Sequence, residues 1–133
     1  MNRWGTKSKR VLATLDPRLQ VVMNELLLLV DVSLISGYRD REEQNTLFEN
    51  GLSKVRYPDS KHNRRPSLAV DLQPAPYPVS EKELWAALGL IAGLSIMIAS
   101  NHGWTLRWGG DWNMNGSIVD NGFNDLFHLE LIE

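Results

Sequence analysis

The stretch Ser60-Lys61-His62-Asn63-Arg64-Arg65-Pro66-Ser67-Leu68-Ala69-Val70-Asp71 organises both the fold and the chemistry that we expect of this chain. It begins as a polar, basic loop broken by proline and ends in an apolar run, Leu68 to Leu72, that predicts a short strand. The loop has an imidazole, His62, near one end and a carboxylate, Asp71, at the other. A second imidazole arrives near the C-terminus, in Asp125-Leu126-Phe127-His128.

Two imidazoles and one carboxylate form a donor set typical of hydrolytic zinc enzymes, whose fourth coordination position is left for water. Zinc lowers the pKa of that water to roughly 7, which makes hydroxide available at neutral pH. The chain has no cysteine, so any metal site must use His, Asp or Glu. A single His is nevertheless more often an ordinary surface or core residue. We assign His102 to that class, because it stands beside the helix-ending Gly103 and favours the helix dipole.

Two acidic residues flank His128. Asp125 lies three residues earlier and could take a proton from water and pass it to a leaving amine. In a strand it would face away from His128, so we expect it in a turn before the strand. Glu130 lies two residues later, on the same strand face as His128. It could fix an imidazole ligand or simply be a surface charge, and we do not expect it to be the base.

Length and composition indicate one domain spanning residues 1–133. The chain has 43% hydrophobic and 23% charged residues, which predicts an ordered core, and a net charge of −2, which argues against nucleic acid as the main partner. Met1 to Arg10 lacks the apolar core of a signal peptide. Leu84 to Ser100 is shorter than the roughly 20 apolar residues that span a bilayer. We therefore expect a soluble cytoplasmic monomer without stable membrane insertion.

Capping residues and hydrophobic periodicity predict three helices and four strands. The helices begin at Asp16-Pro17, Asp40 and Ser80. The third, Glu81 to about Asn101, is apolar almost all round, which predicts a central buried helix. The predicted strands are Val32–Ser36, Leu68–Leu72, Trp104–Trp108 and Phe127–Ile132, and the prolines Pro74, Pro76 and Pro78 predict irregular structure up to Ser80. The expected fold is α+β, with a small, mostly antiparallel sheet packed with helices.

The segment Asp111-x-Asn113-x-Asn115-Gly116 matches the first half of a calcium-binding loop. The Glu expected at the twelfth position is replaced by Gly122, although Asp120 could substitute for it. The sequence therefore leaves two interpretations of this segment. One is a calcium site on Asp111, Asn113, Asn115 and Asp120, and the other is an ordinary Asx-rich turn.

Several motifs together resemble one family. Ser60-x-His62 … Ala69-x-Asp71, with Asp125-x-x-His128, resembles the zinc peptidases of the D-alanyl-D-alanine carboxypeptidase type. Within that group the chain is most similar to phage endolysins that cleave the L-alanyl-D-glutamate bond of peptidoglycan. Ser36-Gly37-Tyr38-Arg39 resembles the family's substrate-arginine segment, and Arg107 to Trp112 resembles the segment before its last zinc histidine. The similarity runs from about Val11 to the C-terminus.

The resemblance implies a fold like that of the hedgehog and D,D-peptidase domains, zinc on His62, Asp71 and His128, and Asp125 as the catalytic carboxylate. It also implies that Arg39 binds a carboxylate or carbonyl oxygen of the substrate, and we expect Tyr38, Ser60 and Trp112 to contact the substrate as well. A guanidinium offers a fixed fork for a carboxylate and can stabilise an oxyanion.

The residues alone leave other roles open for the substrate-binding candidates. Arg39 could form a surface salt bridge with Asp40 or Glu43, Ser60 could merely shape the loop, and Trp112 could cover the core.

The loop between the first two expected ligands departs from the family pattern. It is lengthened by Asn63 to Pro66, and Ser67 stands where the family usually has Gly. The ligands can converge if the extra residues bulge outward.

The resemblance thus implies a zinc-dependent endolysin that hydrolyses the L-alanyl-D-glutamate bond of the stem peptide for host lysis. It would be made in the host cytoplasm and reach the wall after another protein permeabilises the membrane. One alternative is a D,D- or L,D-carboxypeptidase acting on muropeptides. An alternative of another class is a non-catalytic zinc-containing module that binds wall or protein, since the hedgehog signalling domain resembles this family.

Overall fold

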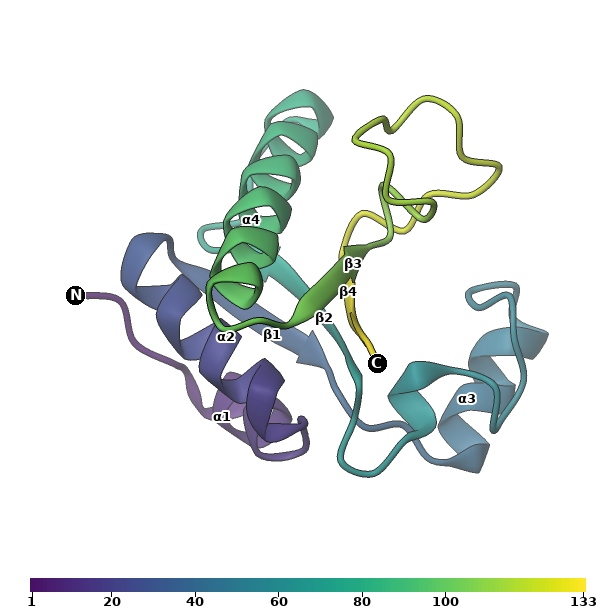
Figure 1. Cartoon of the computed structure of the whole chain (residues 1–133). Coiled ribbons are helices and arrows are strands. Elements are labelled where there is room, and N and C mark those ends of the chain that lie inside the picture. The colour runs from purple at the N-terminus through teal and green to yellow at the C-terminus, as the bar shows by residue number, and fades with distance from the viewer.

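A computed structural model describes all 133 residues and has an α+β architecture (Figure 1). The elements in chain order are α1 (Thr6–Ala13), α2 (Pro17–Leu29), β1 (Val32–Ser36), α3 (Arg41–Glu49), the short 3-10 helix η1 (Lys61–Asn63), β2 (Ala69–Pro74), α4 (Glu81–Asn101), β3 (Thr105–Trp108) and β4 (His128–Ile132). The predicted fold class, one small domain with an antiparallel sheet and packed helices, is confirmed.

The four strands form one sheet in the order β1-β2-β4-β3, and every neighbouring pair is antiparallel. The central strands β2 and β4 come from distant parts of the sequence. Their register places Asp71 opposite His128, and the register of β3 with β4 places Arg107 opposite Glu130. Residues that face each other in an antiparallel pair lie on the same side of the sheet, so these four side chains share one face.

The other face of the sheet carries the hydrophobic core. Figure 1 shows α1, α2 and α4 gathered on one side of the sheet, with α3 set apart on the other. Alternation along the strands sends Val70 and Leu72 of β2, and Leu129 and Leu131 of β4, into this core, where each is at most 1% exposed. The residues between them, Asp71 and Glu130 among them, therefore point to the open face.

The predicted helix boundaries agree with the structure. The side chains of Asp16, Asp40 and Ser80 each accept a hydrogen bond from a backbone N–H in the first turn of α2, α3 and α4. Gly51 and Gly103 follow α3 and α4 with φ of +75° and +81°, a conformation that glycine adopts without steric cost.

Two short elements differ from prediction. Helix α1 was not predicted, because the first turn carries mainly polar residues. Strand β2 continues to Pro74, which pairs with Val32, so the expectation of irregular structure was wrong at Pro74 and right for residues 75–80. Proline is tolerated there because the pairing of β2 with β4 stops at Asp71, which leaves only one neighbouring strand at Pro74.

The prediction that the third helix is buried on all sides was also wrong. Helix α4 packs one face against α2, β2 and β3, whereas Trp85, Leu90 and Met97 are each more than half exposed. Its length of 21 residues and a mean hydropathy of 1.7 over its best window would suffice, by length and composition alone, to cross a membrane.

His102 caps the C-terminal end of α4 and pairs with Glu25, in agreement with the structural role expected for it.

Candidate active site

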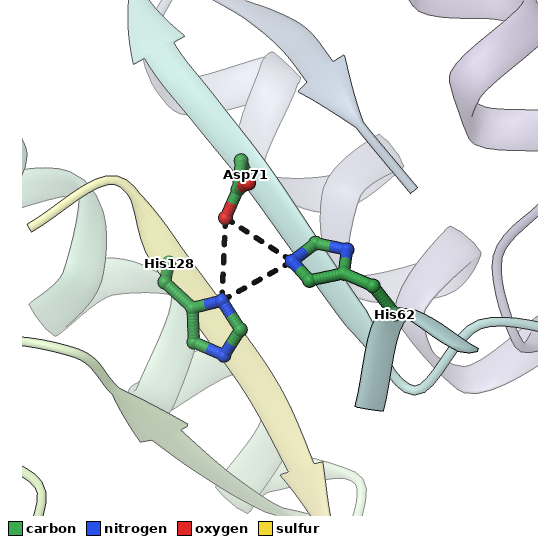
Figure 2. Close-up of side chains that lie close together, drawn as sticks. All are labelled: His62, Asp71 and His128. Atoms are coloured by element: carbon green, nitrogen blue, oxygen red, sulfur yellow. Dashed lines mark hydrogen bonds and ion pairs between the residues drawn. The ribbon is translucent and has the colours of Figure 1, made fainter. Parts of the chain in front are cut away.

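Three side chains from separate segments converge on the open face of the sheet (Figure 2). Asp71 comes from β2, His128 from the start of β4, and His62 from η1. The Oδ1 atom of Asp71 lies 3.3 Å from Nε2 of His62 and 3.2 Å from Nδ1 of His128. The two imidazole nitrogens are 3.3 Å apart. One oxygen and two nitrogens therefore form a nearly equilateral triangle.

The dimensions of this triangle fit a tetrahedral metal ion. Ligand atoms at about 2.0–2.1 Å from a tetrahedral ion such as zinc lie roughly 3.3 Å from one another. All three edges have this length, and the three residues form a cluster of ligand atoms able to hold a metal. Three donors leave one tetrahedral position for another ligand. The spacing and chemistry of the donors therefore match a metal centre of the kind that metallopeptidases use.

Local contacts orient His62. Ser60 caps η1 by accepting a hydrogen bond from the backbone N–H of His62, and the carbonyl of His62 accepts one from the backbone N–H of Arg39 at 2.8 Å. Its Nδ1 lies 2.7 Å from the carbonyl oxygen of Gly37. Because a carbonyl can only accept, Nδ1 carries the proton and the lone pair of Nε2 faces Asp71 and His128.

Gly37 can occupy this position only because it lacks a side chain. A Cβ atom there would lie 2.4 Å from Oγ1 of Thr14 and 2.9 Å from a methyl carbon of Leu15. The close packing of Gly37 against this turn brings its carbonyl to His62.

His128 is oriented by Glu130. The Nε2 atom of His128 lies 2.8 Å from Oε1 of Glu130, so Nδ1 is the nitrogen turned toward the other two donors. Glu130 is only 5% exposed, which excludes the surface charge that the sequence left open. The Trp112 ring lies 5.5 Å from the His128 ring, centroid to centroid, and covers the imidazole on another side.

Asp71 has a second partner that the sequence did not indicate. Its Oδ2 atom accepts a hydrogen bond from Nη2 of Arg39 at 2.6 Å, and Nε of Arg39 donates to Oγ of Ser36 at 3.0 Å. Neither Asp40 nor Glu43 pairs with Arg39, so the alternative of a surface salt bridge with those residues was wrong.

The buried charges compensate one another. Burial favours the neutral form of Asp71, but hydrogen bonds with His128 and His62 outweigh it and hold the pKa of this carboxyl well below its usual range. Burial likewise opposes the charged form of His128, but contacts with Asp71 and Glu130 raise the pKa of this imidazole to about 9. The pKa of Glu130 is lowered to about 2, against the effect of burial, by hydrogen bonds with His128 and Arg107.

Asp125 lies in the turn before β4, as expected, and lines the same groove. Its backbone N–H donates to the carbonyl of Gly109 at 2.8 Å, and its own carbonyl accepts from the N–H of His128 at 3.1 Å. Burial raises the pKa of the Asp125 carboxyl, and the negative charge of Asp71 raises it further. A Cβ atom on Gly109 would lie 2.0 Å from the Asp125 carbonyl oxygen, so this close approach requires glycine.

The groove above the triangle has a volume of about 720 Å³, within the range of ligand-binding clefts. Four of the residues for which the sequence suggests substrate contact or catalysis line it, namely Arg39, Ser60, Trp112 and Asp125. Tyr38 does not line it, and instead the guanidinium of Arg65 lies 5.4 Å from the centre of its ring.

Two cations in the site were missed by sequence reasoning. The side chain of Arg107 donates to Glu130, and Lys61 lies 3.5 Å from the same carboxylate. The position of Arg107 opposite Glu130 would have indicated the first contact, but only once the strand pairing was known.

The lengthened loop between His62 and Asp71 bulges outward in part. Arg64, Arg65 and Pro66 are exposed, as the convergence of the ligands requires. Asn63 does not bulge outward, because it is buried and its side-chain amide donates to the carbonyl of Arg39 at 3.1 Å.

The candidate calcium segment is an internally hydrogen-bonded turn. The carboxylate of Asp111 accepts from the backbone N–H groups of Asn115 and Gly116 at 3.1 and 2.8 Å. The side-chain amides of Asn113 and Asn115 donate to Asp120. These contacts are those of an Asx-rich turn.

Comparisons with known proteins agree with this geometry. A family profile described as phage L-alanyl-D-glutamate peptidase matches residues 1–132. The L-alanyl-D-glutamate peptidase of Escherichia phage T5 is 30% identical over 138 aligned positions, which cover 98% of each protein. The crystal structure of the Serratia marcescens L-Ala D-Glu endopeptidase ChiX superposes with a TM-score of 0.73 and 27% identity, covering 98% of this chain and 90% of that one.

Proposed function

The chain belongs to the phage L-alanyl-D-glutamate peptidase family, and on that premise we propose that it is a zinc-dependent endolysin that cuts the L-alanyl-D-glutamate bond of the peptidoglycan stem peptide. Peptidase activity on peptidoglycan follows from family membership. The identity of the metal and the role of each residue are the proposed part. The observation that supports them most strongly is the triangle of donor atoms, with edges of 3.2 to 3.3 Å, at the floor of the groove.

We assign His62, Asp71 and His128 as the ligands of the zinc ion. Two neutral imidazoles and one carboxylate are a usual ligand set for catalytic zinc. When bound, zinc polarises a carbonyl oxygen and lowers the pKa of water toward neutrality. The chain supplies the rigid frame for this chemistry, because two ligands stand on paired strands and the third is fixed by the carbonyl of Gly37.

Asp125 is the proposed general base and acid. Its carboxylate accepts a proton from the attacking water, and the resulting carboxylic acid gives that proton to the nitrogen of the leaving D-glutamate residue. The raised pKa of Asp125 suits both steps, since a carboxyl of higher pKa holds the transferred proton better than an ordinary aspartate. The close contact with Gly109 fixes the turn from which the carboxylate reaches the groove.

Arg39 and Trp112 are the proposed substrate contacts. Arg39 stands in the groove beside Asp71, where a guanidinium can stabilise negative charge that develops on the carbonyl oxygen of the scissile bond. Trp112 lines the groove next to His128 and offers an apolar wall for the peptide. The Ser60 hydroxyl caps η1 but also lines the groove, so contact with substrate is compatible with its structural role. Tyr38 lies outside the groove lining, so contact between its side chain and the substrate stays a prediction.

Three further expectations accompany this proposal. The enzyme would be made in the host cytoplasm, act on the wall after membrane permeabilisation, and work as a monomer. Calcium binding by the segment from Asp111 to Asp120 stays a prediction, which titration calorimetry with calcium on wild-type protein and on Asp120→Ala would test.

Digestion of purified muropeptides, followed by mass spectrometry, tests the function itself. The proposal predicts products cut between L-alanine and D-glutamate, by zinc-loaded wild-type protein and not by Asp125→Ala or His128→Ala. Loss of only a terminal D-alanine would identify a carboxypeptidase instead. A wild-type protein that binds zinc and cuts no muropeptide would identify a binding module.

A further inference from the structure

We propose that Glu130, held in place by Arg107, is a positioning residue that sets the tautomer and ring orientation of His128 and thereby the affinity of the site for its metal ion. The inference rests on the proposed function in one respect, which is that a metal ion binds at the triangle of His62, Asp71 and His128. It assigns roles to two residues that neither contact that ion nor take part in proton transfer.

Glu130 is nearly buried and contacts His128 directly. Its side chain is 7% exposed, and it lies on the open face of β4, two residues after His128. Oε1 accepts the hydrogen bond from Nε2 of His128 at 2.8 Å. Oε2 accepts from Nη2 of Arg107 at 2.7 Å and lies 3.5 Å from Nζ of Lys61. Each carboxylate oxygen therefore has a separate donor.

The contact with Glu130 decides which nitrogen of His128 can bind a metal. A neutral imidazole carries one proton, and the nitrogen without it supplies the lone pair. In the neutral ring that binds a metal, Glu130 accepts from Nε2, so the proton lies on Nε2 and the lone pair lies on Nδ1, the atom at the corner of the triangle. Without this acceptor the ring can take the other tautomer or rotate, and both changes remove the third donor. Carboxylate partners of this kind also make the ligand imidazole more basic.

Arg107 secures this arrangement from the neighbouring strand. It pairs with Glu130 in the β3–β4 register, and its other terminal nitrogen lies 3.5 Å from the carbonyl oxygen of Trp112. The guanidinium also stands 5.6 Å from the centre of the Trp112 ring, which in turn lies 5.5 Å from the His128 ring. One guanidinium thus contacts both Glu130 and Trp112, the two side chains that neighbour the His128 imidazole besides the metal donors.

The site requires a carboxylate at position 130, and an amide cannot replace it fully. Two donors, from His128 and Arg107, point at the two oxygens of Glu130. A glutamine has one oxygen and one NH2 group, so it would leave one of these donors facing another donor. Glu130→Gln keeps the size and most of the packing while breaking one of the two hydrogen bonds. If Arg107 is removed as well, the amide can turn its oxygen to His128 without that conflict.

Zinc affinity of the folded full-length chain, measured by competition with a chromogenic chelator, tests the inference without relying on activity. We expect Glu130→Gln to lower the affinity about 10- to 100-fold, the usual effect of losing such a partner. Arg107→Met should lower it by about 10-fold or less. The double variant should lose less than the product of the two separate factors, because the residues act as one unit. Glu133→Gln is the matched control, since Glu133 also carries one charge in the C-terminal segment but pairs only with Arg18, away from the site.

The imidazole signals of His128 in ¹H–¹⁵N spectra give a second readout that a general loss of stability would not produce. In zinc-loaded wild-type protein we expect a slowly exchanging Nε2–H proton, and in Glu130→Gln we expect that signal to be lost or shifted. If Glu130→Gln fails to fold, Arg107→Met carries the same test. Wild-type affinity and an unchanged Nε2–H signal in the folded variants would overturn the inference while leaving the proposed function intact. Absence of zinc binding by wild-type protein would instead overturn the proposed function.

Discussion

Asp71 and His128 face each other across the β2–β4 ladder, and Oδ1 of Asp71 lies 3.2 Å from Nδ1 of His128. The pairing of the two central strands therefore brings two of the three donor atoms together. A register shift of one residue would turn one of these side chains toward the core. The integrity of the sheet and the integrity of the site are consequently linked, and this link underlies the predictions that follow.

Removal of the metal should abolish activity and lower the midpoint of thermal unfolding. The ion would tie η1 to the two central strands, and a ligand that binds only the folded state stabilises it by about 2.7 kcal/mol at a concentration of 100 Kd. Wall turbidity assays and scanning calorimetry, before and after chelation and after return of zinc, measure both effects. Full activity in protein verified to be metal-free would contradict the assignment.

Replacing Asp125 with Asn should reduce kcat by about 10²- to 10⁴-fold, the usual contribution of a general acid–base group. The same change should stabilise the metal-free protein at neutral pH. The folded-state pKa of Asp125 is raised by burial and by Asp71, so the ionised form is less favourable in the folded than in the unfolded chain. This cost is present at pH values above the folded-state pKa and disappears as the pH falls below the pKa of the unfolded chain.

Urea unfolding of wild-type and Asp125→Asn proteins over a pH series measures that second effect. The free energy of unfolding should be higher for the variant at neutral pH, and the difference should shrink toward acid pH. Glu49→Gln, which removes an exposed carboxylate near Arg56, is the control for a change of one charge. A variant less stable than wild type at neutral pH would count against the raised pKa.

Gly109→Ala should reduce activity by at least about 10-fold while leaving zinc affinity nearly unchanged. The added Cβ would lie 2.0 Å from the carbonyl oxygen of Asp125, so the turn that carries the proposed base must move. Gly89→Ala is the matched control, because a Cβ there meets nothing within 4 Å on an accessible face of α4. That control should keep full activity and gain up to about 1 kcal/mol of stability. Equal activity of both variants would show that the position of Asp125 does not matter.

Arg39→Met should reduce kcat by about 10²- to 10³-fold if its guanidinium stabilises charge on the scissile carbonyl. It should also destabilise the metal-free protein more than the zinc-loaded one. Asp71 loses its 2.6 Å partner in both states, but a bound cation compensates for part of that loss. Steady-state kinetics and thermal unfolding in both metal states measure these effects, with Arg64→Met as the control because Arg64 lies on the exposed bulge. Unchanged kcat in Arg39→Met would remove this residue from the mechanism.

The sequence predicted much of the fold because its signals are local. Helix caps at Asp40 and Ser80, and the alternation that separates Leu129 from Glu130, depend on neighbouring residues only. The grouping of His62, Asp71 and His128 was predicted from chemistry and family resemblance, and the structure brings their donor atoms together.

The features that the sequence did not predict depend on contacts between distant segments. The pairing of Arg39 with Asp71, and of Arg107 with Glu130, follows from which strands lie side by side and in what register. The exposure of Leu90 and Met97 on α4 could not be predicted either, because a helix that is apolar on all sides gives no sign of which face the rest of the chain will cover.

A crystal structure of the zinc-loaded protein, with anomalous data collected on both sides of the zinc absorption edge, tests the central claim most directly. The account predicts one strong anomalous peak about 2.0–2.2 Å from Nε2 of His62, Oδ1 of Asp71 and Nδ1 of His128. It also predicts that Nε2 of His128 donates a hydrogen bond to Glu130. A peak elsewhere in the chain, or coordination by Nε2 of His128 in place of Nδ1, would contradict it.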